Sequence, residues 1–139
     1  MPKDTPVIGK SNKIVWAGRI ISALPVLLMG SGGVMALVNP APVRPTFTAL
    51  GYPAHLVPVI AVVEVICAIL YAMPQTAVLG AILLTGYLGG ATASHVRVGQ
   101  WLFILPVAVG VLVWMGLYLR DARVRFLIPW RKVAAHSSS

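Results

Sequence analysis

Acidic residues are nearly absent from this chain, which holds three Asp and Glu side chains against eleven Lys and Arg in 139 residues. Charged residues of both signs make up 10% of the chain and hydrophobic residues 58%, whereas soluble domains carry about 25% charged residues. So few charges cannot cover a surface that faces water. The scarcity excludes an ordinary soluble domain and indicates a single domain whose helices lie in a lipid bilayer.

Cysteine is almost missing as well, since Cys67 is the single copy. A lone cysteine forms no disulfide within its chain and no C-x-x-C pair, which excludes dithiol chemistry by this chain alone. Its place inside an apolar run is typical of a small buried side chain. The sequence also lacks a P-loop, a dinucleotide-binding fingerprint, a nucleophile motif and a cluster of metal ligands, so we predict no metal site.

Four long apolar runs are present, at residues 14–38, 54–72, 76–94 and 101–119. Each reaches the length of about 18 residues, with almost no charge, that crosses a bilayer as a helix. The runs are continuous rather than alternating, which is unlike the wall of a membrane barrel. We predict an all-α fold, an antiparallel up-down bundle of four transmembrane helices. Residues 39–53 contain four prolines and a glycine and are predicted as a loop.

Basic residues gather in the two polar tails, residues 1–13 and 120–139, while the loops between the runs hold only Arg44 and Arg97. By the positive-inside rule both tails are predicted to lie in the cytoplasm. Because the basic residues sit at the ends of apolar runs rather than along one helix face, the net charge of +8 does not indicate nucleic-acid binding.

The run at 76–94 is rich in small residues, and Gly86, Gly90 and Ser94 repeat at every fourth position. In lipid, helices associate where small side chains let their backbones approach. We therefore predict that this helix is the centre of the bundle and that these three residues pack against its neighbours. The alternative is a lipid-facing helix that is merely rich in glycine.

Two ionisable residues, Arg19 and Glu64, lie inside apolar runs, where charge is costly and marks a pair or a functional site. Counted from the cytoplasmic ends of their runs, they lie roughly 8 Å and 12 Å deep at 1.5 Å per residue. We predict an ion pair between them that faces the bundle interior. The sequence is equally compatible with Arg19 extending alone to the lipid headgroups.

A second polar group is predicted on the opposite side of the membrane, where His55, His95 and Arg97 end or begin their runs near Arg44. An antiparallel pair of helices would bring the two histidines to one level. Such a pair could bind a metal or a quinone carbonyl, but interfacial hydrogen bonding is the commoner role of such histidines.

Four motifs give the chain a resemblance to a known family. They are R-x-x-S-A-L-P at 19–25, L-G-Y-P at 50–53, E-x6-Y-x-x-P at 64–74 and the segment T-x-x-x-GAILLTGYLGGATASHVRVG at 76–99. Together they resemble the DoxX-like family of small four-helix membrane proteins, over about residues 13–120, and the resemblance implies a four-span protein of the inner membrane. The resemblance implies that Arg19, Glu64, His95 and Arg97 occupy the polar positions of the family pattern.

The resemblance implies relatives that are quinone-reactive membrane subunits of thiosulfate:quinone oxidoreductase, or that join oxidative-stress enzymes in membrane complexes. We expect an accessory or scaffold subunit of a membrane redox or stress-related complex, with a protein partner or a second copy of the chain. One alternative is a quinone-reactive subunit, with quinone as the candidate cofactor and Glu64 or His95 handling protons. Another is a small lipophile-binding or transport protein. A strong Arg19–Glu64 pair would favour the scaffold, because a quinone site needs a free proton acceptor.

Overall fold

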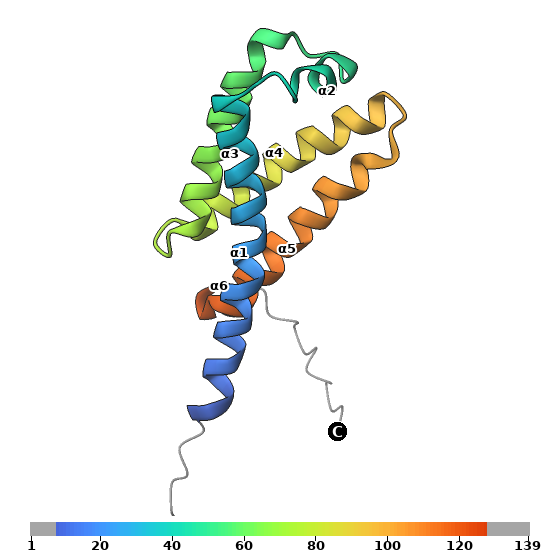
Figure 1. The fold of residues 1–139 in the computed structure, drawn as a ribbon. Coiled ribbons are helices and arrows are strands. Elements are labelled where there is room, and N and C mark those ends of the chain that lie inside the picture. Colours follow the sequence, from blue (N-terminus) through green and yellow to red (C-terminus); the bar gives the residue numbers. More distant parts are fainter. Residues whose placement is uncertain (1–7, 128–139) are drawn as a thin grey trace, which may run out of the picture.

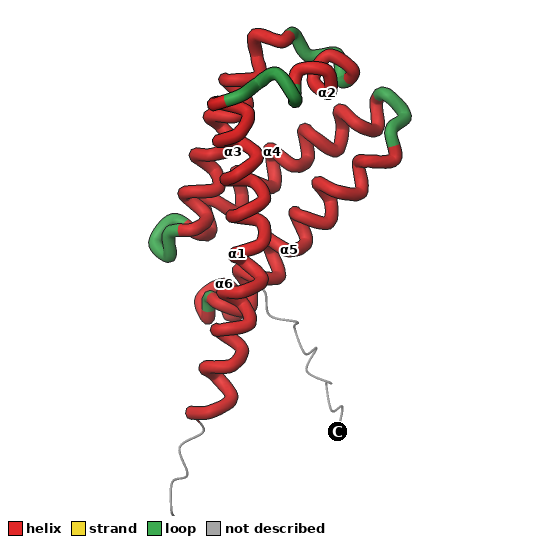
Figure 2. The backbone as a smooth tube through the Cα atoms, in the orientation of Figure 1, coloured by secondary structure: helices red, strands yellow, loops and turns green. Residues whose placement is uncertain are grey.

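A computed structural model describes residues 8–127, which are helical without a strand (Figures 1 and 2). The four long helices are α1 (Ile8–Val38), α3 (Val57–Ala72), α4 (Ala77–Arg97) and α5 (Ile104–Arg120). Four short helices complete the described chain: α2 (Arg44–Ala49), η1 (Ala54–Leu56), η2 (Trp101–Phe103) and α6 (Ala122–Leu127). The predicted all-α class is confirmed.

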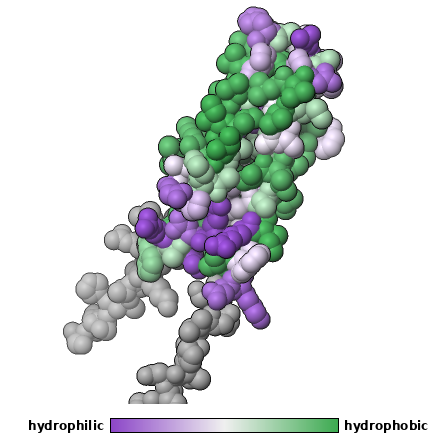
Figure 3. Space-filling model, turned by 60° about the vertical axis from the view of Figure 1, so that its left-hand side comes forward, coloured by the Kyte–Doolittle hydropathy of each residue, from purple (hydrophilic) through white to green (hydrophobic). Residues whose placement is uncertain are grey.

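Four helical stretches are long and apolar enough to cross a membrane: Asn12–Val38, Ala54–Ala72, Ala77–Arg97 and Trp101–Arg120. Large apolar side chains remain exposed along them, among them Leu27, Leu79 and Val111, and Figure 3 shows an apolar band between hydrophilic ends. An exposed apolar band of this kind suits contact with lipid tails. The four-span bundle predicted from the sequence is therefore confirmed, and its environment is a lipid bilayer.

The four long helices form a ring rather than a bundle around one central helix. Helix α1 packs against α3 and α5, and α4 packs against the same two neighbours. The prediction that the glycine-rich helix is the centre of the bundle is therefore wrong. Short connections make α3 and α4, and then α4 and α5, antiparallel neighbours, and α1 closes the ring.

The core is concentrated toward one end of the ring, where all four long helices contribute. Tyr71 of α3, Leu84 of α4, and Val113 and Leu117 of α5 are completely buried there, and Met29 of α1 is largely buried in the same cluster. We call this the closed end. It is also the end at which α6 lies and at which α1 emerges in Figure 1.

The opposite end, called here the open end, has a smaller core built by fewer helices. Ala36 of α1 packs there on Val57 and Ala61 of α3, and Val43 and Phe47 cover them. Helices α4 and α5 lean away from α1 and α3 toward this end, where α2 lies (Figure 1). The pair α4 and α5 thus separates from the pair α1 and α3 toward the open end. Side chains of residues 43–52, called here the α2 segment, occupy part of the space.

Several boundaries differ from the predicted ones. Helix α1 begins at Ile8 rather than at residue 14, so its first turns extend beyond the other helices (Figure 1). The predicted loop contains the helix α2, whose Pro45 stands near its start, where the fixed φ of proline suits a helix. Helix α4 continues to Arg97 rather than 94. The remainder of the two predicted tails, residues 1–7 and 128–139, lies outside the described residues.

Candidate functional site

Tyr71 is the point at which the four long helices meet. Its hydroxyl donates to the Val113 carbonyl of α5 at 2.8 Å and shares a hydrogen bond of 3.0 Å with Ser22 Oγ of α1. A Cβ added at Gly80 of α4 would overlap the Tyr71 backbone. Arg120 of α5 donates from Nη2 to the Tyr71 carbonyl at 2.6 Å, which satisfies an orphan acceptor at the end of α3. We call these five residues the Tyr71 junction.

Glu64 does not pair with Arg19, so the predicted ion pair is wrong. Its Oε2 accepts a hydrogen bond of 2.8 Å from the Tyr87 hydroxyl of α4. Its Oε1 lies 3.5 Å from the position that a Cβ on Gly32 would take. Along α1, Arg19 is about 20 Å from Gly32 at 1.5 Å per residue. That separation is too large for a direct contact.

Arg19 instead lies at the closed end, exposed, in a pocket that it shares with Arg120 and Arg123. The preceding residue, Gly18, abuts the backbone of Leu119 and Arg120. The depth estimate failed because α1 begins before its apolar run does. Its first turns lie beyond the ends of α3 and α5, and a count from residue 14 places Arg19 too deep.

Tyr87, the hydrogen-bond partner of Glu64, lines a pocket of about 350 Å³ between α2, α3 and α4. Tyr87 forms part of its wall, Phe47 and Leu50 of the α2 segment cover it, and Gly86 and Gly90 line its α4 side. We call it the α2 pocket. Its lining is largely apolar with three hydroxyl-bearing residues, a composition typical of small-molecule sites. Its full lining is Phe47, Leu50, Tyr52, Ile60, Gly86, Tyr87, Gly90, Ala91 and Ser94.

The open end is held together by two links between the α2 segment and α4. Arg97 donates from Nη2 to the Leu50 carbonyl, beside Gly51, whose φ of 82° is one that glycine adopts without strain. Tyr52 and Ser94 share a hydrogen bond of 2.7 Å between their hydroxyls. These links fix the cover of the α2 pocket in place.

The two histidines of the predicted outer cluster share no hydrogen bond with each other among the described residues. His95 Nδ1 is hydrogen-bonded to Gln100 Oε1 at 2.8 Å, across the turn between α4 and η2. His55 is exposed in η1. Within residues 8–127 no three His, Cys, Asp or Glu side chains gather as a metal site would require. Of the predicted cluster, Arg97 is the residue that joins two elements.

The glycine motif takes a different role from the predicted one. A Cβ added at Gly86 or Gly90 would meet no atom within 4 Å, so neither residue makes a close helix contact within the chain. Both line the α2 pocket instead. Ser94 is buried and donates to the Gly90 carbonyl at 2.8 Å. Close backbone approach occurs at other glycines, namely Gly18, Gly33, Gly80 and Gly116.

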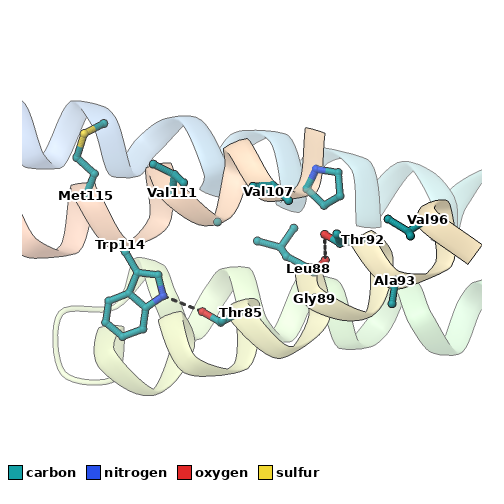
Figure 4. A pocket seen from close by; sticks show the side chains of 12 residues that line it. Thr85, Leu88, Gly89, Thr92, Ala93, Val96, Val107, Val111, Trp114 and Met115 are labelled. Carbon is teal, nitrogen blue, oxygen red and sulfur yellow. Dashed lines mark hydrogen bonds between the residues drawn. The ribbon is translucent and has the colours of Figure 1, made fainter. Parts of the chain in front are cut away.

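A groove of about 800 Å³ lies between α4 and α5 and runs from Trp114, beside the core, to Val96 near the end of α4 (Figure 4). Leu88 and Thr92 of α4 face Val107 of α5 across it. Trp114 donates from Nε1 to Thr85 Oγ1 at 2.8 Å and closes one end. Thr92 donates to the carbonyl of its own helix at Leu88, at 2.8 Å. The groove is therefore apolar, with its hydroxyls already satisfied.

Sequence reasoning overlooked the tyrosines and Ser22. Tyr71 and Ser22 both stand in motifs quoted for the resemblance, as does Tyr87, and each makes a hydrogen bond between helices. Ordinary polar residues inside apolar spans are the signal that could have found them, because a hydroxyl in hydrocarbon needs a partner. The prediction rested on charged residues alone and therefore missed these hydroxyl groups.

Comparison with known families settles the relationship. The model of the DoxX-like family matches residues 20–116. The chain belongs to the DoxX-like family. The match covers well over half of the chain, including Glu64, Tyr71 and Tyr87, but it begins one residue after Arg19. No curated protein and no solved structure matches the chain.

Proposed function

We propose that this DoxX-like protein is a membrane subunit that binds a quinone, or a lipophile with similar ring oxygens, in the α2 pocket. The observation that carries the proposal is the hydrogen bond of 2.8 Å between Tyr87 and Glu64. It puts a hydroxyl of the pocket wall in contact with a carboxyl group inside a membrane span. An ionisable side chain at such a position marks a functional site by default.

Because Glu64 is not paired with Arg19, quinone binding is favoured over a scaffold role. A quinone site needs a group that donates or accepts a proton within hydrogen-bond reach of the ring oxygen. A buried ion pair would have occupied the Glu64 carboxylate, whereas its contact with Tyr87 leaves a route for a proton from one side chain to the other. The missing pair therefore favours ligand binding over a purely structural role for Glu64.

The pocket lining suits a flat ring with an apolar tail. Phe47 and Ile60 provide apolar walls, while Tyr52, Tyr87 and Ser94 provide hydroxyls. All three hydroxyls make hydrogen bonds within the protein, Ser94 to Gly90, Tyr52 to Ser94 and Tyr87 to Glu64. Tyr87 is the candidate to contact a ring oxygen, because it is the one of the three that is bonded to an ionisable side chain. Reduction of a quinone takes two electrons and two protons. With a single cysteine, the chain needs a redox partner protein to supply the electrons.

Quinone binding can be tested on the full-length protein in mild detergent with a quinone that carries a short decyl tail. Removing the ring hydrogen bond in Tyr87→Phe should weaken binding about tenfold, the effect of losing one hydrogen bond of about 1.4 kcal/mol. Glu64→Ala should weaken it also, since Tyr87 loses the acceptor that orients it. Tyr118→Phe is the matched control, because Tyr118 does not line the α2 pocket.

Equal affinities for the wild type, Tyr87→Phe and Tyr118→Phe would contradict the α2 pocket as the site. A solvent extract of the protein purified from native membranes gives an independent readout. Quinone in near-stoichiometric amount, lost from the Tyr87→Phe variant, is the expected result.

An accessory or scaffold subunit of a redox or stress-related complex is the second candidate. The α4–α5 groove favours it, because Gly89, Ala93 and Gly110 give this groove a lining of small residues, which lets a partner helix approach closely. The test is a cysteine placed at Val107 or, as a control, at Leu27 on α1, followed by cross-linking in native membranes. Cross-linking to one partner from residue 107 alone is the expected result, and equal labelling from both positions contradicts it.

The basic residues support a placement in the inner membrane with both termini in the cytoplasm. The first and the last long helix reach the same end of the ring, since Gly18 of α1 abuts Arg120 of α5. A membrane-impermeant thiol reagent should label Thr46→Cys in α2 from outside the cell and should leave Asn12→Cys unlabelled. The reverse pattern would invert the proposed orientation.

A further inference from the structure

Three arginines from three helices converge on one pocket at the closed end. Arg19 of α1, Arg120 of α5 and Arg123 of α6 line a space of about 620 Å³ together with Gln75 of the α3–α4 turn. Asp121 is the one carboxylate in this lining, and its Oδ1 accepts a hydrogen bond of 2.8 Å from the Arg123 backbone. The pocket therefore carries an excess of positive charge. We call it the arginine pocket.

The charge of the arginine pocket is not cancelled from within. No guanidinium group among these three lies within the 4.0 Å of a carboxylate that defines a salt bridge, as far as residues 12–126 are concerned. Arg120 is held by its bond to the Tyr71 carbonyl, and its guanidinium carbon lies 4.6 Å from the centre of the Tyr71 ring. One Arg is thus preorganised, and two exposed ones can close around a ligand.

Guanidinium groups bind phosphate through paired N–H donors, which gives them a preference for oxyanions over simple negative charge. Gln75 adds an amide that can donate a further hydrogen bond. A single phosphate group has the negative charge and the acceptor oxygens that these donors require.

The position of the arginine pocket indicates that the phosphate belongs to a lipid headgroup. Ala72 ends one candidate span, Ala77 begins the next and Arg120 ends the last, and all three residues line the pocket. The pocket is therefore at the level where apolar helix surface gives way to headgroups. Exposed apolar side chains continue the surface into the bilayer, such as Ile20, which follows Arg19. Basic pockets between membrane helices at this level hold the headgroups of anionic lipids.

We infer that the arginine pocket binds the phosphate of an anionic phospholipid headgroup and so joins α1, α5 and α6 at the closed end. The lipid tails lie along the exposed apolar side chains of α1 that follow Arg19, such as Ile20 and Leu24. The site is separate from the α2 pocket, which lies at the other end of the ring, and its occupancy does not depend on quinone binding.

Lipid binding to the full-length, delipidated protein in detergent tests this inference, by native mass spectrometry and by the shift in Tm. Phosphatidylglycerol should bind and raise the Tm more than phosphatidylcholine with the same tails. The double substitution Arg19→Gln with Arg123→Gln should weaken phosphatidylglycerol binding about 25-fold, because each basic residue near an anionic headgroup contributes a factor of about five to the affinity and the two factors multiply. Arg44→Gln, which removes one positive charge at the open end, is the control for the effect of lost charge away from the arginine pocket.

Loss of affinity confined to the double variant supports the inference. Equal binding of the two lipids, unchanged phosphatidylglycerol binding in the double variant or an equal loss in Arg44→Gln overturns it. Inorganic phosphate is the second arm: displacement of the lipid by phosphate at millimolar concentration would identify a free-anion site and reject the lipid. If the double variant fails to fold, Arg123→Gln alone serves, because this exposed side chain lies beyond the last candidate span.

Discussion

The closed end and the open end of this small membrane protein differ in how their helices meet. At the closed end the backbones touch at Gly80 and Gly116, and Tyr71 bonds to neighbours on α1 and α5. At the open end the glycines of α4 face empty space, and pockets lie on both sides of that helix. One glycine-rich helix therefore serves two purposes: its first turns lock the bundle, and its later turns leave room for a ligand.

The largest expected effect comes from removing the side chain at the centre of the closed end. Tyr71→Ala should lower the free energy of unfolding by about 3–5 kcal/mol, because it leaves a cavity and unpaired groups on two helices. The Tm in detergent and the yield of monodisperse protein measure the loss. A variant as stable as the wild type would show that the closed end does not hold the bundle together.

Removing a single hydroxyl compares the two ends directly. Tyr71→Phe should cost about 1 kcal/mol, since it breaks the bonds to Ser22 and Val113 at a fully buried site. Tyr87→Phe should cost less, because Tyr87 is half-buried and makes one bond to Glu64. Denaturation in mixed detergents provides both values. A larger loss from Tyr87→Phe would reverse the proposed ranking of the two ends.

The cover of the α2 pocket should respond locally rather than globally. Arg97→Gln breaks the bond to the Leu50 carbonyl and should raise hydrogen exchange in residues 44–52 severalfold, with little change in the core. Hydrogen exchange followed by mass spectrometry reads both regions in one experiment. An equal rise around Tyr71 would mean that the two ends are coupled.

The smallest effect is expected at the α4–α5 groove. Trp114→Phe loses one exposed hydrogen bond to Thr85 Oγ1 and keeps most of the aromatic surface. The change in stability should stay within about 0.5 kcal/mol. A larger loss of Tm would show that this groove is part of the stabilising core.

Composition and apolar runs were sufficient to predict the fold class and the four spans. They could not locate Arg19, because the depth of a residue depends on where neighbouring helices end, and α1 extends past them. The role of Gly86 and Gly90 also depended on the arrangement in space: the sequence shows that a close approach is allowed there, not that a helix fills the space. Tyr71 and Tyr87 could have been noticed as hydroxyls in hydrocarbon, but their partners on other helices could not be known from one chain.

The contrast between the two ends is tested most directly by one pair of substitutions on the same helix. Gly80→Ala should lower the Tm markedly, because the new Cβ would overlap the Tyr71 backbone and overpacking costs about 1–3 kcal/mol. Gly86→Ala should leave the Tm unchanged or raise it, since its Cβ meets open space and alanine favours a helix over glycine. Equal losses from the two substitutions, or a larger loss from Gly86→Ala, would contradict a bundle that is closed at Tyr71 and open beside α2.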